Sequence, residues 1–260
     1  MVAPPIYPVR LEGRLEPGLS RWLWLVKWLL AIPHFIVLAF LWIAFVVLSV
    51  VAFFAILFTA RYPRGIFEFN LGVLRWTWRV AFYSYGELGT DRYPPFTLGA
   101  APEYPATLDV VYPGELSRGL VLVKWWLLAI PHYLLVGVFL GEGFAWGGGW
   151  DWGGHDRGWG GGPGLIALLV LFAGVALLFT TRYPRGIFGF VLGLDRWVAR
   201  VAAYAGLMTD VYPPFRLDQG GEERAARGID EPPIPPPAGD EAAETPRWSS
   251  TAPSATTTAS

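Results

Sequence analysis

Long stretches of apolar residues dominate the pattern of hydrophobic and polar positions along the chain. The first covers residues 22–59, and its segment 35–58 holds 24 residues without a charge. Further apolar runs occupy residues 120–140 and 165–181. Because 18 or more such residues are typical of a membrane span, the pattern predicts a mainly α-helical integral membrane protein.

The same motifs occur twice along the chain and in the same order. LLAIPH begins at Leu29 and again at Leu127, and RYPRGIF begins at Arg61 and again at Arg182. The chain is therefore a tandem duplication, and the larger offset of the second motif places an insertion in the second copy. The predicted segments are a first repeat (1–99), a second repeat (100–217) with a Gly/Trp-rich loop (141–163), and a Pro-rich acidic tail (218–260) that we expect to be disordered.

Each repeat follows one plan. A strand-like alternation opens it, with Tyr7, Val9 and Leu11 against Arg10 and Glu12. The apolar run, RYPRGIF, an amphipathic aromatic helix and a YPPF segment follow, and we expect the amphipathic helix to lie in the membrane interface. Both repeats contribute strands to one small predicted sheet on the cytoplasmic side. The predicted helices are 71–85 and 192–205, and the predicted strands are 6–13, 93–98, 104–111 and 212–217.

The first apolar run allows two arrangements. Its 38 residues would extend ~57 Å as a helix, nearly twice the ~30 Å hydrocarbon core of a bilayer. In one arrangement residues 22–32 lie in the interface, Pro33 kinks the chain and a single span follows. In the other, the run is a hairpin of two spans that turns near Ala39–Ala44. Basic residues on both flanks favour the hairpin, although its turn contains no Gly, Pro or polar residue.

Composition and charge agree with a membrane protein. Apolar residues make up 53% of the chain, which is high for a soluble domain of 260 residues. Residues 218–260 hold eight acids and three arginines, whereas 1–217 hold 13 acids and 17 basic residues. A basic aromatic body of this kind suits an anionic membrane surface better than nucleic acid. With no cysteine, the chain has no disulfide framework and no thiolate metal site.

The order of these motifs resembles the domain-of-unknown-function 4389 (DUF4389) family of bacterial membrane proteins. The similarity rests on YPVRLEG, SRWLWLVKWLLAIPH, LFTARYPRGIF, RWTWRV and DRYPPFTL, and it extends over most of 6–98 and of 104–217. The resemblance implies a membrane protein. It supplies no activity and no catalytic residue.

Arginines that follow the apolar runs are the first candidate binding residues. Two arginines three positions apart, directly after a membrane helix, can bind lipid phosphates or the carboxylates of a partner. A second pair at i,i+4 lies on the following helix. The alternative is that they only fix orientation and pair with acids such as Asp91 and Asp210. The candidates are Arg61, Arg64, Arg75, Arg79, Arg182, Arg185, Arg196 and Arg200.

Lys27 and His34 are ionisable residues within the apolar run, and Lys124 and His132 repeat them. Such residues inside a membrane segment are candidates for function. However, the additional Trp126 lengthens the spacing in the second repeat by one residue, which predicts a rotation of His132 by about 100° in an ideal helix. The favoured interpretation is therefore that the lysines extend to the headgroups and that each histidine caps a proline kink.

No catalytic or cofactor motif is present in the sequence. A G-x-S-x-G elbow, an H-E-x-x-H pair and a phosphate loop are all missing, and the Gly/Trp-rich loop makes a poor metal site. We expect no cofactor and no metal. The favoured function is a non-enzymatic module of the cell membrane, multi-pass with cytoplasmic termini, that binds anionic lipid or organises a membrane-protein partner. A transporter or transporter subunit and an enzyme acting on a lipid are the alternatives.

Overall fold

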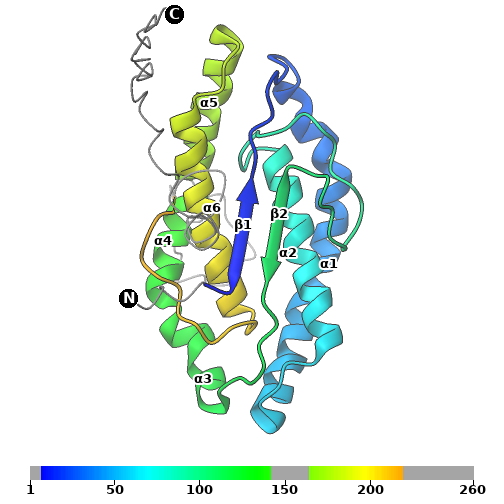
Figure 1. The fold of residues 1–260 in the computed structure, drawn as a ribbon, viewed down its shortest axis with the longest axis vertical. Helices are drawn as coiled ribbons and strands as arrows, with labels where there is room; N and C mark the ends of the chain where they lie inside the picture. Colours follow the sequence, from blue (N-terminus) through cyan, green and yellow to red (C-terminus); the bar gives the residue numbers. More distant parts are fainter. Residues whose placement is uncertain (1–6, 142–163, 219–260) are drawn as a thin grey trace, which may run out of the picture.

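The computed structural model describes residues 7–141 and 164–218, and within them the chain is mainly helical (Figure 1). The order of elements is the same in both repeats, except that the second divides its apolar run. The first repeat contains β1 (Val9–Gly13), α1 (Trp24–Thr59) and α2 (Arg64–Tyr83). The second contains β2 (Ala106–Val110), α3 (Arg118–Val123), a π-helical turn (Lys124–Leu128), α4 (Ile130–Leu140), α5 (Leu165–Thr180) and α6 (Arg185–Ala205).

α1 is one continuous helix of 36 residues, so the hairpin turn predicted near Ala39–Ala44 is wrong. The sequence there, LWIAFV, offers no residue that favours a turn, and the helix also continues through Pro33. α1 ends at Ala60, whose left-handed backbone (φ 57°) lets its N–H donate to the Ile56 carbonyl. Among the described residues, α1 alone has the length and composition to cross a membrane, or two segments do if the bent pair α3–α4 counts as one span.

The second repeat builds its apolar run from shorter helices. α3, α4 and α5 follow one another on the side of the molecule opposite α1 and run antiparallel to it (Figure 1). The end of α4 lies directly beside the start of α5. The backbones of Gly141 and Gly164 are so close there that a Cβ added to Gly164 would lie 2.3 Å from the Gly141 nitrogen. The predicted external loop, 141–163, falls outside the described residues except at Gly141. Gly141 and Gly164, which flank the segment 142–163, therefore lie side by side between α4 and α5.

β1 and β2 form an antiparallel sheet that joins the two repeats. Leu11 pairs with Leu108 at its centre, and these are equivalent residues of the two copies. The sheet has two strands among the described residues, whereas four were predicted. The YPPF segments, 93–98 and 212–217, are not strands, since two consecutive prolines remove the N–H groups that a ladder needs.

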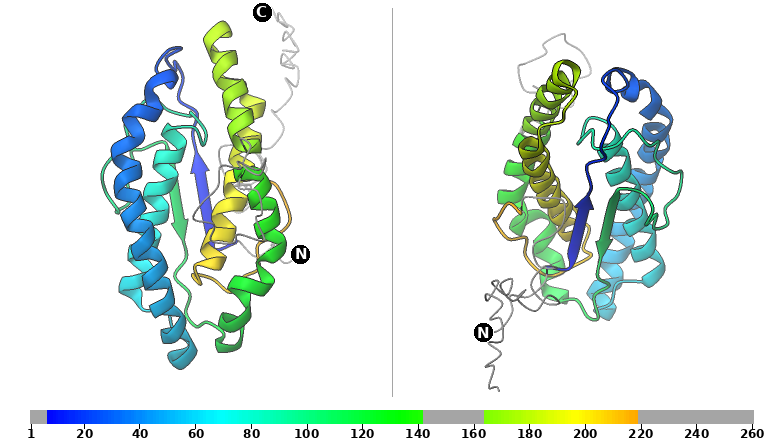
Figure 2. Two further views of the ribbon diagram at one scale, coloured as in Figure 1. Left: turned by 180° about the vertical axis from the view of Figure 1, so that it is seen from behind. Right: turned by 45° about the horizontal axis from the view of Figure 1, so that its top comes forward.

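α2 and α6 lie between the sheet and the long apolar helices. Seen from behind, α1 on one side and α4 with α5 on the other lie nearest the viewer, and the sheet lies beyond them (Figure 2). The prediction that the apolar face of this helix lies in the membrane interface is therefore wrong. That face is buried within the protein, and it includes Leu71, Leu74, Trp78 and Phe82 of α2. Apolar side chains from both repeats and from the sheet form one continuous core.

Candidate functional site

Lys27 of α1 points into the protein, with 1% of its surface exposed. Its Nζ donates to the Thr90 carbonyl at 2.6 Å and lies 2.9 Å from Asp91 Oδ1. Lys124 repeats this arrangement, with its Nζ 3.0 Å from the Thr209 carbonyl and 2.7 Å from Asp210 Oδ1. The interpretation that these lysines extend to the headgroups is wrong, because each has a carboxylate partner inside the fold. The same carboxylates were assigned to the arginines in the topological alternative, and that pairing is wrong as well.

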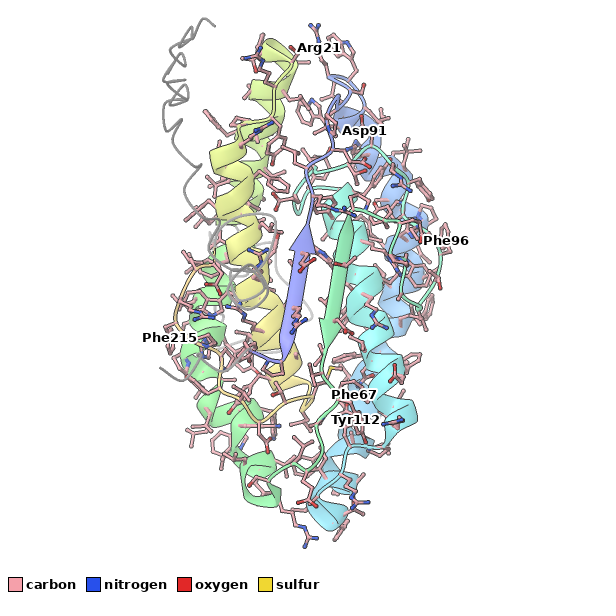
Figure 3. The ribbon with its side chains drawn as sticks, in the orientation of Figure 1. Arg21, Phe67, Asp91, Phe96, Tyr112 and Phe215 are labelled. Atoms are coloured by element: carbon pink, nitrogen blue, oxygen red, sulfur yellow. The ribbon has the colours of Figure 1, made fainter. Side chains whose placement is uncertain are left out.

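His34 is also buried and is held by aromatic residues of its own repeat. Trp76 Nε1 donates to His34 Nδ1 at 3.0 Å, and the Phe96 ring stacks on the imidazole at 4.0 Å between centroids. In the second repeat, Trp197 Nε1 donates to His132 Nδ1 at 3.1 Å, and the His132 ring stacks on Phe215 at 4.4 Å between centroids. Phe96 and Phe215 thus lie on opposite sides of the molecule (Figure 3). The histidines thus anchor the YPPF segments through these ring contacts.

The extra residue Trp126 does not rotate His132 away from Lys124. A π-helical turn, Lys124–Leu128, accommodates that residue within the helix. Downstream of the turn the chain returns to the register of the first repeat, so Lys124 and His132 keep the partners that Lys27 and His34 have. The predicted rotation is wrong because it assumed an ideal α-helix.

Four of the eight candidate arginines hold the fold together. Arg75 donates to the Leu108 carbonyl and pairs with Asp109 of β2. Arg79, which is buried, donates to the carbonyls of Gly99 and Thr97. Burial lowers the pKa of the Arg79 guanidinium. These contacts leave neither side chain directed at a lipid surface.

The equivalent arginines of α6 bind the first strand and the end of the second repeat. Arg196 donates to the Leu11 carbonyl at 2.8 Å and to the Asp218 carbonyl at 2.7 Å. Arg200 pairs with the Asp218 carboxylate at 2.7 Å. Asp218, the first residue of the predicted tail, therefore belongs to the folded body. The remainder of the predicted tail lies outside the described residues.

The other four arginines are exposed and lie where the apolar helices end. The backbone N–H of Leu116 donates to the Ala60 carbonyl, which brings Arg118 near the end of α1. At the opposite end, Gly18 and Leu19 line one hollow with Arg182 and Arg185, and Arg21 lies at that same end (Figure 3). We call these groups the arginine ends. The first contains Arg61, Arg64 and Arg118, and the second contains Arg21, Arg182 and Arg185.

Large apolar side chains are exposed between the two arginine ends. On α1 they include Phe35, Phe40, Val47, Phe54 and Phe58, the last of which is 73% exposed. α4 and α5 expose a comparable set, which includes Leu134, Val138, Phe172 and Phe179. A surface of this extent marks a site of membrane or protein contact.

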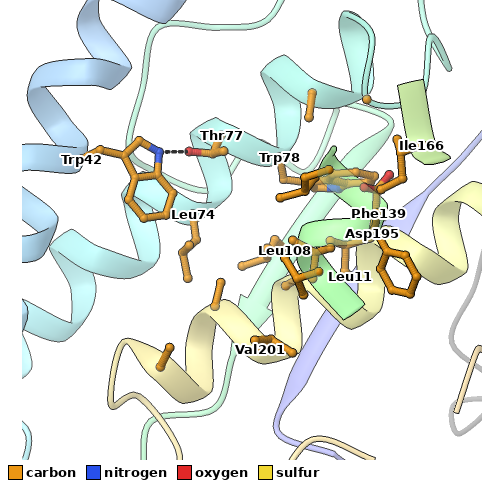
Figure 4. Close-up of a pocket in the computed structure, with 18 of the residues that line it drawn as sticks. Leu11, Trp42, Leu74, Thr77, Trp78, Leu108, Phe139, Ile166, Asp195 and Val201 are labelled. Carbon is orange, nitrogen blue, oxygen red and sulfur yellow. Dashed lines mark hydrogen bonds between the residues drawn. The ribbon is translucent and has the colours of Figure 1, made fainter. Parts of the chain in front are cut away.

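A cavity of about 580 Å³ lies between the two repeats (Figure 4). α2 and α6 form much of its wall, and residues of the sheet, α1, α4 and α5 complete it. Its lining is apolar and aromatic, with Trp42, Trp78, Tyr85, Tyr133 and Phe139. Its volume falls within the ~300–1,000 Å³ of small-molecule pockets.

One acidic group, Asp195 of α6, reaches this cavity, and Glu87 is its buried neighbour. Neither carboxylate oxygen of Glu87 nor Oδ2 of Asp195 has a hydrogen-bond partner among the described residues. Burial, and then the charge of Asp195, raise the pKa of Glu87 well above its usual range. Burial raises the pKa of Asp195 to about 7.

The acid pair was not predicted from the sequence, whose long apolar runs contain no Asp or Glu. Both acids lie outside those runs, and they meet only because the two repeats pack together. One signal was available. Aligning the repeats places Leu74 opposite Asp195 and Gly206 opposite Glu87, so each acid interrupts an otherwise well matched region.

A family model described as "Domain of unknown function (DUF4389)" matches residues 21–97 and 164–216, which together make up half of the chain. The two segments fall in the two repeats, as the motifs predict. No curated protein and no solved structure matches the chain.

Proposed function

The chain belongs to the DUF4389 family, and we propose that it is a non-enzymatic lipid-binding module embedded in one face of the cell membrane. In this proposal α1 and the α3–α4–α5 stack lie along the membrane plane, and the sheet faces water. The exposed apolar surface of the two long helices is the observation that carries the proposal. On the opposite face, Arg10 and Asp109 of the sheet are exposed to solvent.

Length argues against a simple crossing by α1. A helix of 36 residues extends ~54 Å, whereas the hydrocarbon core is ~30 Å thick. Exposed apolar residues continue from Trp22 to Phe58, so no shorter central segment stands out as the span. An α1 helix that lies along the membrane plane keeps its exposed apolar residues in contact with lipid over its whole length.

The second repeat supports the same orientation. The segment 142–163 contains Asp151, His155, Asp156 and Arg157 and leaves the helix stack at Gly141. In a crossing arrangement this junction would lie deep in the hydrocarbon core, where charged residues are costly. In the planar arrangement the junction lies near the headgroups. Both RYPRGIF segments then share one membrane surface, which is the side that the basic flanks favour.

The arginine ends would bind lipid phosphate. α2 and α6 each begin at an arginine, Arg64 and Arg185, and neither helix has an acidic residue in its first turn. Neither N-cap proline supplies a side-chain hydrogen bond. Free N–H groups at a helix N-terminus beside arginines favour an anionic oxygen. Each arginine is expected to contribute ~1 kcal/mol near an anionic surface.

The orientation can be tested by depth measurements along α1. The chain has no cysteine, so Leu29→Cys, Ile43→Cys and Phe54→Cys can each carry one environment-sensitive fluorophore in reconstituted vesicles. These residues project from the same exposed side of α1. Quenchers at known lipid depths should place all three labels at the same depth. A label at position 43 that is much deeper than the other two would show that α1 crosses the bilayer.

The lipid preference can be tested by flotation with vesicles of phosphatidylcholine, with and without phosphatidylglycerol. Wild-type protein should prefer the anionic vesicles. The quadruple change of Arg61, Arg64, Arg182 and Arg185 to Gln should strongly reduce the preference but not the association. Arg10→Gln on the sheet face is the matched control. An unchanged preference in the quadruple variant would contradict lipid binding at the arginine ends.

A further inference from the structure

We propose that the cavity between the repeats binds a lipophilic monovalent cation, and that Asp195 with Glu87 supplies the opposing charge. The proposed ligand is an apolar or aromatic molecule that carries one positive charge. This inference goes beyond the membrane proposal and does not depend on the orientation of the molecule in the bilayer.

The lining of the cavity supports a cation with apolar substituents. Trp78 and Trp42 have their indole N–H groups engaged, at the Glu12 carbonyl (3.1 Å) and at Thr77 Oγ1 (3.2 Å). Figure 4 shows the second of these bonds and the position of Asp195 among apolar side chains. With the N–H groups occupied, the rings offer the cavity their apolar surfaces. Aromatic faces attract cations, and the attraction is strongest where water is excluded.

Polar groups at the cavity wall, other than the acids, are already satisfied. The hydroxyl of Tyr85 donates to the Trp24 carbonyl at 3.0 Å, and that of Tyr133 donates to the Trp125 carbonyl at 2.6 Å. Neither is directed at the acid pair. Asp195 is therefore the acceptor that a ligand would meet at the cavity wall. Its Oδ2, like both carboxyl oxygens of the neighbouring Glu87, has no hydrogen-bond partner among the described residues.

Charge balance favours one positive charge on the ligand. The charged and titratable groups that face the acid pair are Arg196, which acts on Glu87, and Tyr183, whose hydroxyl donates to the Glu87 carbonyl at 2.8 Å. With both carboxyl groups ionised, the acids carry two negative charges against one on Arg196. A bound monocation would neutralise the remainder. In the empty state a proton on the pair has the same effect, so cation binding would release that proton to solvent.

A groove on the apolar surface adjoins the cavity. A groove between α1 and α2 is lined by the exposed Phe35 and by Ala39. It shares Trp42, Thr77 and Ala81 with the cavity. Under this proposal, a lipophilic cation dissolved in a membrane would approach the cavity from this groove.

The test uses the full chain in detergent and two probes of the same shape and opposite charge. Labelled tetraphenylphosphonium should bind in a saturable way in equilibrium dialysis, and tetraphenylborate should not. Asp195→Asn and Glu87→Gln should each weaken tetraphenylphosphonium binding at least about tenfold, as expected for loss of a charged partner. Glu68→Gln, which alters an exposed acid of α2, is the matched control and should bind like wild type.

Two further measurements separate the site from a general effect on folding. Ala202→Phe places a ring in the cavity and should abolish tetraphenylphosphonium binding, while flotation with vesicles stays unchanged. Binding to wild type should weaken from pH 8 to pH 5 as the acid pair takes up a proton, although the probe carries a fixed charge. Equal binding of both probes, or wild-type binding by the folded Asp195→Asn, Glu87→Gln double variant, would overturn the proposal.

Discussion

The two repeats reach the same interior geometry by different routes. The first uses one unbroken helix, α1, and the second uses α3, a π-helical turn, α4 and α5. In both, a buried lysine meets an aspartate and a buried histidine meets a tryptophan and a phenylalanine. The contacts were thus retained while the helix that presents them changed. Side-chain contacts, and not helix regularity, define the unit that is repeated.

The acid pair is where the repeats differ most in chemistry. Tyr183 donates to the Glu87 carbonyl, and on the equivalent side Tyr62 donates to the Gly206 carbonyl. Near Tyr62 the buried polar partner is a neutral amide, Asn70, whose Nδ2 donates to the Tyr62 hydroxyl at 2.9 Å. One side of the repeat interface therefore carries two buried acids, whereas the described residues around Tyr62 on the other side include a buried amide in their place.

The largest effect should come from removing the carboxylate partner of a buried lysine. Asp91→Ala and Asp210→Ala each leave an ammonium group inside the protein without its counter-charge. We expect each to lower the free energy of unfolding by about 3 kcal/mol, towards the lower end for buried pairs because the aspartates are partly exposed. Denaturant titration in detergent measures this. If one repeat loses far more than the other, the two lysine sites are not equivalent.

A smaller effect should follow from the substitution Asp195→Leu. It gives the second repeat the leucine that the first repeat has at the equivalent position, Leu74. The pKa of Asp195 is raised in the folded state, so this carboxyl contributes stability at low pH that is lost as the pH rises towards 7. The variant should therefore gain stability relative to wild type at pH 8, on the order of 2 kcal/mol, and show less difference at pH 4. Thermal unfolding at the two pH values checks this. A gain that does not depend on pH would show that packing, and not ionisation, is responsible.

Replacing the buried histidines should cost less. His34→Phe and His132→Phe keep a ring for stacking but remove the acceptor of the Trp76 or Trp197 indole N–H. An unsatisfied buried donor costs about 1–3 kcal/mol. The change can be followed by the unfolding midpoint together with the indole N–H resonance. If the resonance does not move in either variant, the hydrogen bond is absent in solution.

The smallest effect should follow from deletion of Trp126, which restores the spacing of the first repeat. We expect the π-helical turn to become α-helical and His132 to keep its contacts, with a change in stability below about 1 kcal/mol. The His132 ring resonances, which report stacking on Phe215, are the measurement. Loss of that stacking would mean that the π-helical turn positions His132 and does not merely absorb a residue.

The repeat, its order of elements and its shared sheet could be predicted because each leaves a local pattern. RYPRGIF, LLAIPH and the alternation around Val9 and Leu11 are such patterns. Burial of Lys27 and Arg79 could not be predicted, because their partners, Asp91 and the Gly99 carbonyl, come from loops whose positions depend on the whole fold. The hydrophobic periodicity of α2 also predicted a membrane-binding face, whereas α2 buries that face under the sheet.

The structure assigns different roles to some of the predicted site residues, whereas lipid binding by Arg61, Arg64, Arg182 and Arg185 stays a prediction. Arg75, Arg79, Arg196 and Arg200 were expected at a lipid surface. They instead hold β2, the carbonyls of Thr97 and Gly99, the Leu11 carbonyl of β1, and Asp218. The rotation of His132 was computed for an α-helix, whereas one extra residue can be stored as a π-helical turn. The burial of Asp195 could not be predicted, because a lone acid in an amphipathic helix is typical of its polar, solvent-facing side.

The sheet register has a consequence for how such a chain can change over time. Leu11 pairs with Leu108, its own equivalent, so the strands would pair equally well if they came from two identical chains. In such an isologous dimer every substitution occurs in both subunits. An acid gained on one side of the interface therefore also appears at the symmetry-related position on the other side. Joining the halves in one chain removes that constraint. Only then can one half acquire Glu87, the other acquire Asp195, and the interface hold a single acid pair beside a single cavity.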